Sequence, residues 1–69
     1  PRSIQTIDTP LGPCQIKVRE LGDHIAGSPE FEDCLRLSKA HAIPLREVYR
    51  VVERSFEKIS KTQKDPSHD

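Results

Sequence analysis

The chain has 69 residues, 33% of them hydrophobic, with eleven basic and eleven acidic side chains and a formal net charge of zero. A chain of this length forms at most one small domain, and its balanced charge argues against a dedicated nucleic-acid binder, which normally carries a basic excess. No apolar run reaches membrane-spanning length and no signal peptide is visible, so no membrane partner is expected.

The first half of the chain predicts three strands. Residues 14–19 alternate cleanly between apolar and polar side chains, which is the period of a half-buried strand. Residues 4–8 are rich enough in β-branched side chains for a partner strand, and residues 24–27 form a short third one. Turn residues fill 9–13 and 21–23, so the three segments are expected to pair as an antiparallel meander.

A first helix is predicted where the period changes at Ser28. Ser28 can cap this helix and Pro29 fits its first position, while acidic side chains in the following turn complement the helix dipole. The apolar stripe is expected at i, i+3, i+4 and i+7, that is, at Phe31, Cys34, Leu35 and Ser38.

A second helix follows a tight corner at residues 40–43. Pro44 is expected at its first position with Glu47 in its first turn. Its apolar stripe comprises Leu45, Val48, Tyr49, Val52, Phe56 and Ile59, so the helix should end near Ser60. The predicted fold is α+β and two-layered: a three-stranded antiparallel meander followed by two antiparallel helices on one face. Residues 1–60 form the single domain, and 61–69 are expected to be a disordered tail.

Three carboxylates, Glu30, Glu32 and Asp33, gather at the predicted start of the first helix. Glu30 and Asp33 share a face and could hold Mg²⁺ or Mn²⁺ together with substrate phosphates. The same acids would also be expected there merely to satisfy the amides of a helix start. The sequence leaves both interpretations open.

Cys34, joined by Cys14 across the strand–helix interface, could offer soft sulfur ligands to nickel or zinc. Its place on the apolar stripe favours a core role instead. Two cysteines without framework spacings fit free thiols in a reducing compartment, so we expect a cytoplasmic protein. The three histidines (His24, His41 and His68) are scattered and predict no ligand set.

Basic side chains offer two candidate anion surfaces. Lys17 and Arg19 point away from the predicted core, and Arg46, Arg50 and Arg54 form an i, i+4, i+8 stripe whose guanidinium groups could bind phosphate. Interleaved glutamates equally allow a solvated face with local pairs. No Ser-His-Asp order, glycine-rich phosphate loop or zinc signature is present, so the catalytic residues stay unknown.

Four segments together resemble one known family. They are Thr9-Pro10-Leu11-Gly12, Ile16-Lys17-Val18, residues 29–34 (PEFEDC) and residues 43–49 (IPLREVY). This pattern is similar to the C-terminal domain of the lactate racemase nickel insertion protein, the pyridinium-3,5-bisthiocarboxylate mononucleotide nickel chelatase. The resemblance covers about residues 9–52.

The chain departs from the family pattern at three positions. Leu11 stands where an aromatic residue is common, Phe31 where Tyr is common, and Ala42 where Gly is common. The first two keep apolar bulk. Ala42 indicates a corner that either needs no positive φ or tolerates strain there.

The resemblance implies a CTP-dependent cyclometallase that inserts nickel, its substrate metal, into a pincer nucleotide precursor, with Mg²⁺ or Mn²⁺ accompanying the CTP. On that basis Lys17, Arg46 and Arg50 are nucleotide-binding candidates, and Glu30 and Asp33 are metal candidates. The chain would be a C-terminal fragment of a longer enzyme and inactive alone.

Two other functions stay open. The helical corner could belong to a nucleic-acid interaction module, although the net charge argues against it. The chain could also be a structural oligomerisation module. With no Trp or Met and only two Phe and one Tyr, its core is thin, so a homo-oligomer is expected whichever function holds.

Overall fold

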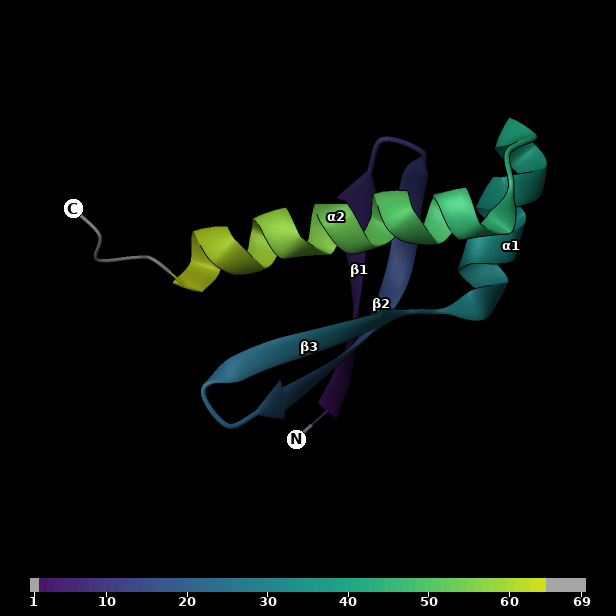
Figure 1. Ribbon diagram of the computed structural model, residues 1–69. Coiled ribbons are helices and arrows are strands. Elements are labelled where there is room, and N and C mark those ends of the chain that lie inside the picture. The colour runs from purple at the N-terminus through teal and green to yellow at the C-terminus, as the bar shows by residue number, and fades with distance from the viewer. Residues whose placement is uncertain (1, 65–69) are drawn as a thin grey trace.

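The computed structural model describes the backbone of residues 2–64 and the side chains of residues 2–61. Three strands form one antiparallel sheet in the order β1-β2-β3, and two helices follow. The elements are β1 (Arg2–Thr9), β2 (Gly12–Leu21), β3 (His24–Pro29), α1 (Phe31–His41) and α2 (Leu45–Lys64) (Figure 1). The predicted α+β class, with all described strands before the helices, is confirmed.

Two short turns hold the meander together. Thr9 pairs with Gly12 across the first turn and Leu21 pairs with His24 across the second. In the first turn the Thr9 hydroxyl donates to the Gly12 carbonyl at 2.7 Å and accepts the Leu11 N–H at 3.0 Å. The side chain of Thr9 therefore replaces backbone partners that a tight turn leaves unpaired.

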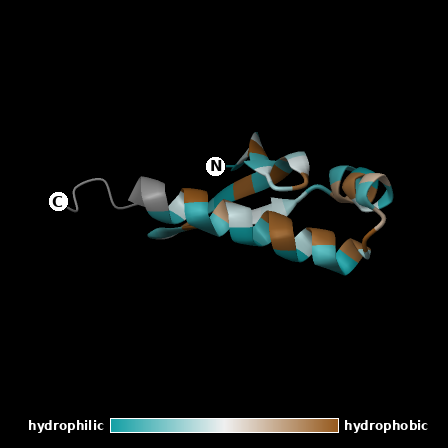
Figure 2. Cartoon of the chain, turned by 90° about the horizontal axis from the view of Figure 1, so that it is seen from above, coloured by the Kyte–Doolittle hydropathy of each residue, from teal (hydrophilic) through white to brown (hydrophobic). Residues whose placement is uncertain are grey.

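The core lies between the inner sheet face and the two helices. The predicted alternation of β2 is confirmed, because Cys14, Ile16 and Val18 are buried while their neighbours in sequence are exposed. The other buried side chains are Ile7, Cys34, Leu37, Val48 and Val52. Figure 2 shows the hydrophobic positions recurring along α2 between hydrophilic ones, as an amphipathic helix requires.

Gly27 allows α2 to lie close to β3. A Cβ atom built on Gly27 would lie 2.7 Å from Cε2 of Phe56 and 2.9 Å from Cγ2 of Ile16. Any larger residue would therefore displace the Phe56 ring or the strand beneath it. Phe56 is half-buried and packs against the core at this point.

The predicted start of the first helix is wrong. Ser28 and Pro29 belong to β3, paired with Lys17 and Ile16, and the helix begins only at Phe31. Glu30 occupies the N-cap in an extended conformation and makes no side-chain cap hydrogen bond. The backbone of Ser28 and Pro29 pairs with β2, and this pairing takes the place of the predicted helix capping.

The apolar stripe of α1 is also rotated from its predicted position. Cys34 and Leu37 are buried, whereas Phe31 is 50% exposed and Leu35 and Ser38 are half-buried. The rotation follows from the later helix start, which is fixed to β2 through the hydrogen bonds described below. Cys34 is the one residue of the predicted stripe that is fully buried.

The second helix matches its predicted stripe, but it begins one residue after Pro44, which was predicted at its first position. It begins at Leu45, and the amides of Glu47 and Val48 donate to the Pro44 carbonyl. Leu45, Tyr49, Phe56 and Ile59 are partly buried around buried Val48 and Val52.

The second helix ends later than the sequence predicted. It extends to Lys64 rather than about Ser60, because Lys and Gln are good helix formers and cations suit a helix C-terminus. Residues 65–69 of the predicted tail lie outside the described residues. No helix in the described part of the chain is long and apolar enough to cross a membrane.

The two helices meet at a corner centred on Ala42. Ala42 adopts a left-handed conformation, with φ 57° and ψ 45°, so the corner does require a positive φ. The Ser38 hydroxyl donates to the Ile43 carbonyl at 2.6 Å, and the Ile43 N–H donates to the Ser38 carbonyl at 3.2 Å. Beyond this corner α2 runs crosswise to α1 rather than alongside it (Figure 1).

Replacing Ala42 by Gly should stabilise the protein by about 1 kcal/mol, because glycine adopts the left-handed conformation without the steric cost of a Cβ. The free energy of unfolding in urea measures this change. Ala40→Gly, two residues earlier in regular helix, is the matched control and should destabilise by about 0.5–1 kcal/mol. Equal effects of the two substitutions would contradict the strained corner.

Candidate functional site

Three cations gather on the sheet face that points away from the helices. Lys17 and Arg19 come from β2 and Arg2 from β1, where Arg2 is the direct cross-strand partner of Arg19. With Ser28, Pro29 and Glu30 they line a depression of about 350 Å³. We call this group of Arg2, Lys17 and Arg19 the cationic cluster.

The cationic cluster carries uncompensated charge. Like charges directly opposite on neighbouring strands destabilise a sheet. Among the residues whose side chains are described, none of the three makes an ion pair. Among the described residues that line the depression, Glu30 supplies the only carboxylate, so positive charge is in excess there. The arrangement suits an anion with several oxygens, since guanidinium groups bind such oxygens in pairs.

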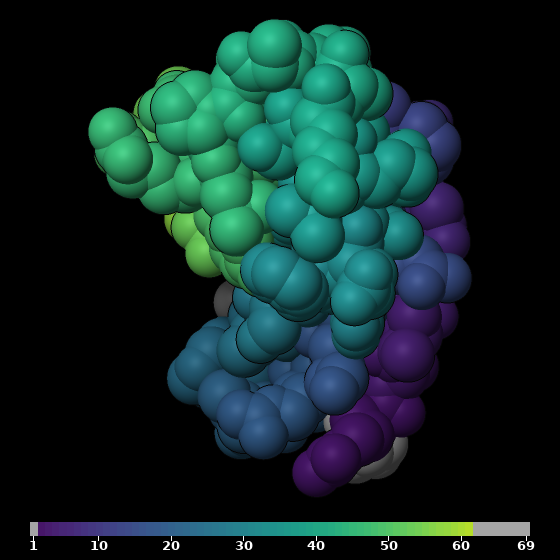
Figure 3. All heavy atoms as spheres, turned by 90° about the vertical axis from the view of Figure 1, so that its right-hand side faces the viewer, coloured from purple at the N-terminus to yellow at the C-terminus, as the bar shows by residue number. Residues whose placement is uncertain are grey.

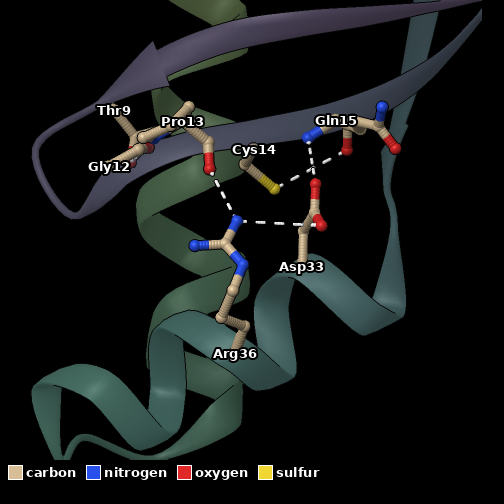
Figure 4. A network of polar contacts seen from close by, with 7 residues as sticks. All are labelled: Thr9, Gly12, Pro13, Cys14, Gln15, Asp33 and Arg36. Atoms are coloured by element: carbon tan, nitrogen blue, oxygen red, sulfur yellow. Dashed lines mark hydrogen bonds and ion pairs between the residues drawn. The ribbon is translucent and has the colours of Figure 1, made fainter.

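Asp33 ties helix α1 to strand β2 (Figure 4). Its Oδ2 accepts the Gln15 N–H at 2.7 Å, while its Oδ1 lies 3.7 Å from Nη2 of Arg36. The same Nη2 donates to the Pro13 carbonyl at 3.1 Å. The Glu30 N–H donates to the Gln15 carbonyl at 2.9 Å, so both backbone groups of Gln15 are bonded to the start of α1.

This network bears on the predicted metal pair. The Asp33 carboxylate is occupied with the Gln15 amide and Arg36, whereas Glu30 lines the depression beside Lys17. The described residues contain no group of three or more His, Cys, Asp or Glu side chains that could hold a metal ion. A divalent cation at this place would therefore need phosphate oxygens among its ligands, as Mg²⁺ commonly does.

Cys14 and Cys34 are free, adjacent and fully buried. Burial raises the pKa of Cys14, and burial together with the neighbouring Cys14 thiol raises the pKa of Cys34 to about 12. Metals bind the thiolate rather than the thiol. Two thiols held protonated in the core therefore act as small apolar side chains, in agreement with the core role predicted for Cys34.

The arginines of α2 lie apart from the cationic cluster. Arg50 and Arg54 line a second depression of about 330 Å³ with Lys58, Glu47 and Pro10. Arg46 is exposed and lines neither depression. The structure therefore separates the predicted nucleotide ligands Lys17 and Arg50 into two places.

Sequence reasoning missed Arg2. Nothing in its neighbourhood marks it as a ligand, but a two-residue turn at Pro10 and Leu11 would have set it opposite Arg19. His41, predicted to have no role as a ligand, bonds instead to the first hairpin: its Nε2 lies 2.7 Å from the Leu11 carbonyl.

Comparison with known proteins decides the family. The sequence model of a family described as nickel insertion protein matches residues 1–49 of this chain. The chain belongs to the nickel insertion protein family. A relative from Roseiflexus castenholzii is 44% identical over 52 residues, which is 74% of this chain and 13% of the relative. The resemblance predicted from the four sequence segments is confirmed.

Two further relatives carry more specific names. The pyridinium-3,5-bisthiocarboxylic acid mononucleotide nickel insertion protein of Acetivibrio thermocellus is 37% identical over 80% of this chain. A solved structure with 33% identity and a TM-score of 0.74 covers 83% of this chain and 40% of its own. It is the apo form of LarC2, the C-terminal domain of a cyclometallase involved in the synthesis of the NPN cofactor of lactate racemase.

The chain spans only a small part of the proteins it matches. It covers 13% of the Roseiflexus relative and 14% of the Acetivibrio relative. Its match to LarC2 places it within that domain's fold without accounting for most of the domain. The matches therefore establish the family of this chain but not the activity of the whole protein.

Replacing Asp33 by Ala should destabilise the protein by about 1 kcal/mol, because the Gln15 amide loses its charged acceptor. Glu32→Ala, at an exposed position in the same helical turn, is the control for lost helix-dipole stabilisation. Urea unfolding gives the free energies, and amide exchange at Gln15 should be faster in the Asp33 variant alone. An unchanged rate of amide exchange at Gln15 would contradict the role of Asp33 in holding α1 to β2.

The raised thiol pKa values predict a loss of stability in alkali. The unfolded thiols deprotonate near their ordinary value of 9.0, while folded Cys34 stays protonated until about pH 12. The folded state then binds more protons, so the free energy of unfolding falls as pH rises through this window. The fall is about 1.4 kcal/mol per pH unit for each such thiol at most.

The variant Cys34→Ala isolates the contribution of this thiol. Urea unfolding between pH 7 and pH 10.5 should give a shallower alkaline decline for the variant than for the parent. Titrations of groups that do not interact with Cys34 are common to both proteins and cancel in the difference. Parallel declines would show that the Cys34 thiol does not titrate abnormally.

Proposed function

We propose that this chain is the C-terminal part of a CTP-dependent nickel insertion protein and that it contributes a site for the CTP phosphates. The parent would be a cyclometallase, of the lyase class, that inserts nickel as substrate into a pincer nucleotide precursor. The names of the Acetivibrio relative and of the LarC2 domain support the nickel and cofactor parts of this proposal. The cationic cluster is the observation that supports phosphate binding.

Lys17 is the nucleotide ligand that the geometry favours. It lines the depression on the open sheet face together with Arg19 and Glu30, and Arg2 lines it from the neighbouring strand. A triphosphate would neutralise a cluster that has no described ion pair of its own. Arg46 and Arg50 remain candidates from the resemblance, but they lie at a different surface.

Glu30 is the better placed of the two metal candidates. It lines the depression with Lys17, so one carboxylate oxygen and the CTP phosphates could share a Mg²⁺ or Mn²⁺ ion. Asp33 would have to share its carboxylate with the Gln15 amide. The free buried thiols fit a reducing compartment, and we propose the cytoplasm. We also propose that the chain self-associates.

Binding of Mn²⁺ and CTP tests the proposal. Thermal shift should show stabilisation by CTP with Mn²⁺, and less by ATP or GTP. Lys17→Ala should weaken CTP binding about tenfold or more, since it removes a charge-assisted contact. Lys39→Ala removes an exposed lysine on α1 and is the matched control. Binding unchanged in Lys17→Ala but weakened in Arg46→Ala or Arg50→Ala would move the site to α2.

The proposed role of Glu30 as a metal ligand is tested by a separate measurement. Glu30→Gln keeps the size of the side chain and removes its charge, so it should weaken the dependence of CTP binding on Mn²⁺. Glu32→Gln, in the first turn of α1 but outside the depression, is the control. An identical Mn²⁺ dependence in parent and Glu30→Gln would exclude Glu30 as a ligand. A parent that binds no CTP would exclude the site altogether.

A further inference from the structure

The ladder between β2 and β3 continues one residue beyond the end of β3, with one backbone bond in place of two. Ile16 pairs with Pro29, so Gln15 and Glu30 are the next residues in register. A hydrogen-bonded antiparallel pair exchanges two bonds between the same two residues. The Glu30 N–H makes one of them, to the Gln15 carbonyl at 2.9 Å. The Glu30 carbonyl instead accepts the Cys34 N–H at 3.1 Å, as the first bond of α1.

Asp33 supplies the acceptor that the ladder lacks at this point. Its Oδ2 accepts the Gln15 N–H at 2.7 Å, and this is the bond that the Glu30 carbonyl would accept if β3 continued. The substitution lets the chain change from strand to helix at Glu30 while the central strand keeps its amide paired. The side chain of Asp33 therefore takes the place of a strand carbonyl.

Arg36 has the same role one step further along β2. Pro13 lies two residues before Gln15, so its carbonyl points to the same edge of the strand. Nη2 of Arg36 donates to this carbonyl at 3.1 Å and lies 3.7 Å from Oδ1 of Asp33. Figure 3 shows α1, in teal, continuing from the hairpin of β2 and β3, in blue. Two side chains of α1 thus bond to the edge of β2 where β3 has ended.

This arrangement fixes the face to which the Glu30 side chain belongs. Residues directly opposite each other on two strands present their side chains to the same face of the sheet. Gln15 is two residues from Lys17, so Glu30 shares the open face with the cationic cluster. Glu30 is extended there, with φ −77° and ψ 129°, and its side chain makes no cap hydrogen bond with α1. It lines the same depression as Lys17.

We propose that Asp33 is a positioning residue, which acts through the Gln15 backbone to hold the Glu30 carboxylate at the cationic cluster. Arg36 supports it by holding the Asp33 carboxylate in place. Without that carboxylate, the Gln15 and Cys34 amides compete for the Glu30 carbonyl, so the backbone of Glu30 moves between a strand and a helix position. The proposal rests on the proposed function, in which Glu30 lies beside the CTP phosphates. It assigns Asp33 a role other than that of a metal ligand.

An asparagine at position 33 separates a positioning role from a ligand role. Asp33→Asn keeps an oxygen that accepts the Gln15 N–H, but it removes the charge with which a carboxylate binds a divalent cation. The new NH₂ group would face Arg36, whose side chain is 53% exposed and free to turn into solvent. A positioning residue therefore tolerates this change, whereas Asp33→Ala removes the acceptor altogether.

Calorimetric titration of the full chain with CTP, with and without Mn²⁺, tests the proposal. Asp33→Ala should weaken CTP binding about tenfold in Mn²⁺ and leave metal-free binding unchanged, because the cationic cluster is intact. Asp33→Asn should recover most of the affinity in Mn²⁺. Glu32→Ala, exposed in the same helical turn, is the control and should behave like the parent. A loss in Asp33→Asn as large as that in Asp33→Ala would make Asp33 a ligand and overturn the proposal.

Amide exchange tests the positioning role without any ligand. The amides of Glu30 and Cys34 should exchange faster in Asp33→Ala than in the parent, and Asp33→Asn should slow both again. The amides of Val48 and Val52, buried in α2, report global unfolding and correct for the lower stability of the variant. A parent that binds no CTP would overturn the proposed function alone, because the exchange rates still decide whether Asp33 holds Glu30. Unchanged exchange at Glu30 in Asp33→Ala would overturn the positioning role, whatever the result with CTP.

Discussion

The backbone of Gln15 is the constraint on which the helical half of the molecule depends. Its carbonyl accepts the Glu30 N–H and its amide donates to Asp33. A strand residue that would otherwise continue pairing with β3 is thus bonded to the start of a helix. Because two separate bonds fix this start, the direction of α1 and the rotation of its faces are set together. Cys34 and Leu37 turn into the core as a consequence.

The central strand also joins the core to the candidate site. The pleat that buries Cys14, Ile16 and Val18 turns Lys17 and Arg19 to the opposite face. A slip of one residue would place cations in the core and apolar side chains outside, so the register of β2 is strongly specified. The cationic cluster is therefore held rigidly, because the strand register that buries the core residues also fixes the positions of Lys17 and Arg19. Its third member, Arg2, depends additionally on the first turn.

Local sequence patterns predicted the features that depend on one strand or one helix alone. They failed where two elements can use the same residues. The alternation of β2 and the stripe of α2 are properties of one segment, so both were predictable. Ser28 has the residue type of a helix cap, yet it pairs with Lys17, because a ladder already in register satisfies its backbone. Phe31 illustrates the same limit: its exposure follows from the tie at Gln15. The position of Arg2 opposite Arg19 depends on a turn length that composition alone does not fix.

Clustered like charge links the candidate site to the stability of the fold. Arg2 opposite Arg19 opposes sheet formation by a fraction of a kcal/mol to about 1 kcal/mol. The domain has a small core, yet it retains this unfavourable pair of arginines in the ladder between β1 and β2. An anion of the kind proposed for the cluster would remove the repulsion and would bind only where the strands are in register. Such binding would stabilise the folded state by its own free energy, so occupancy of the cluster and pairing of β1 with β2 would be thermodynamically coupled.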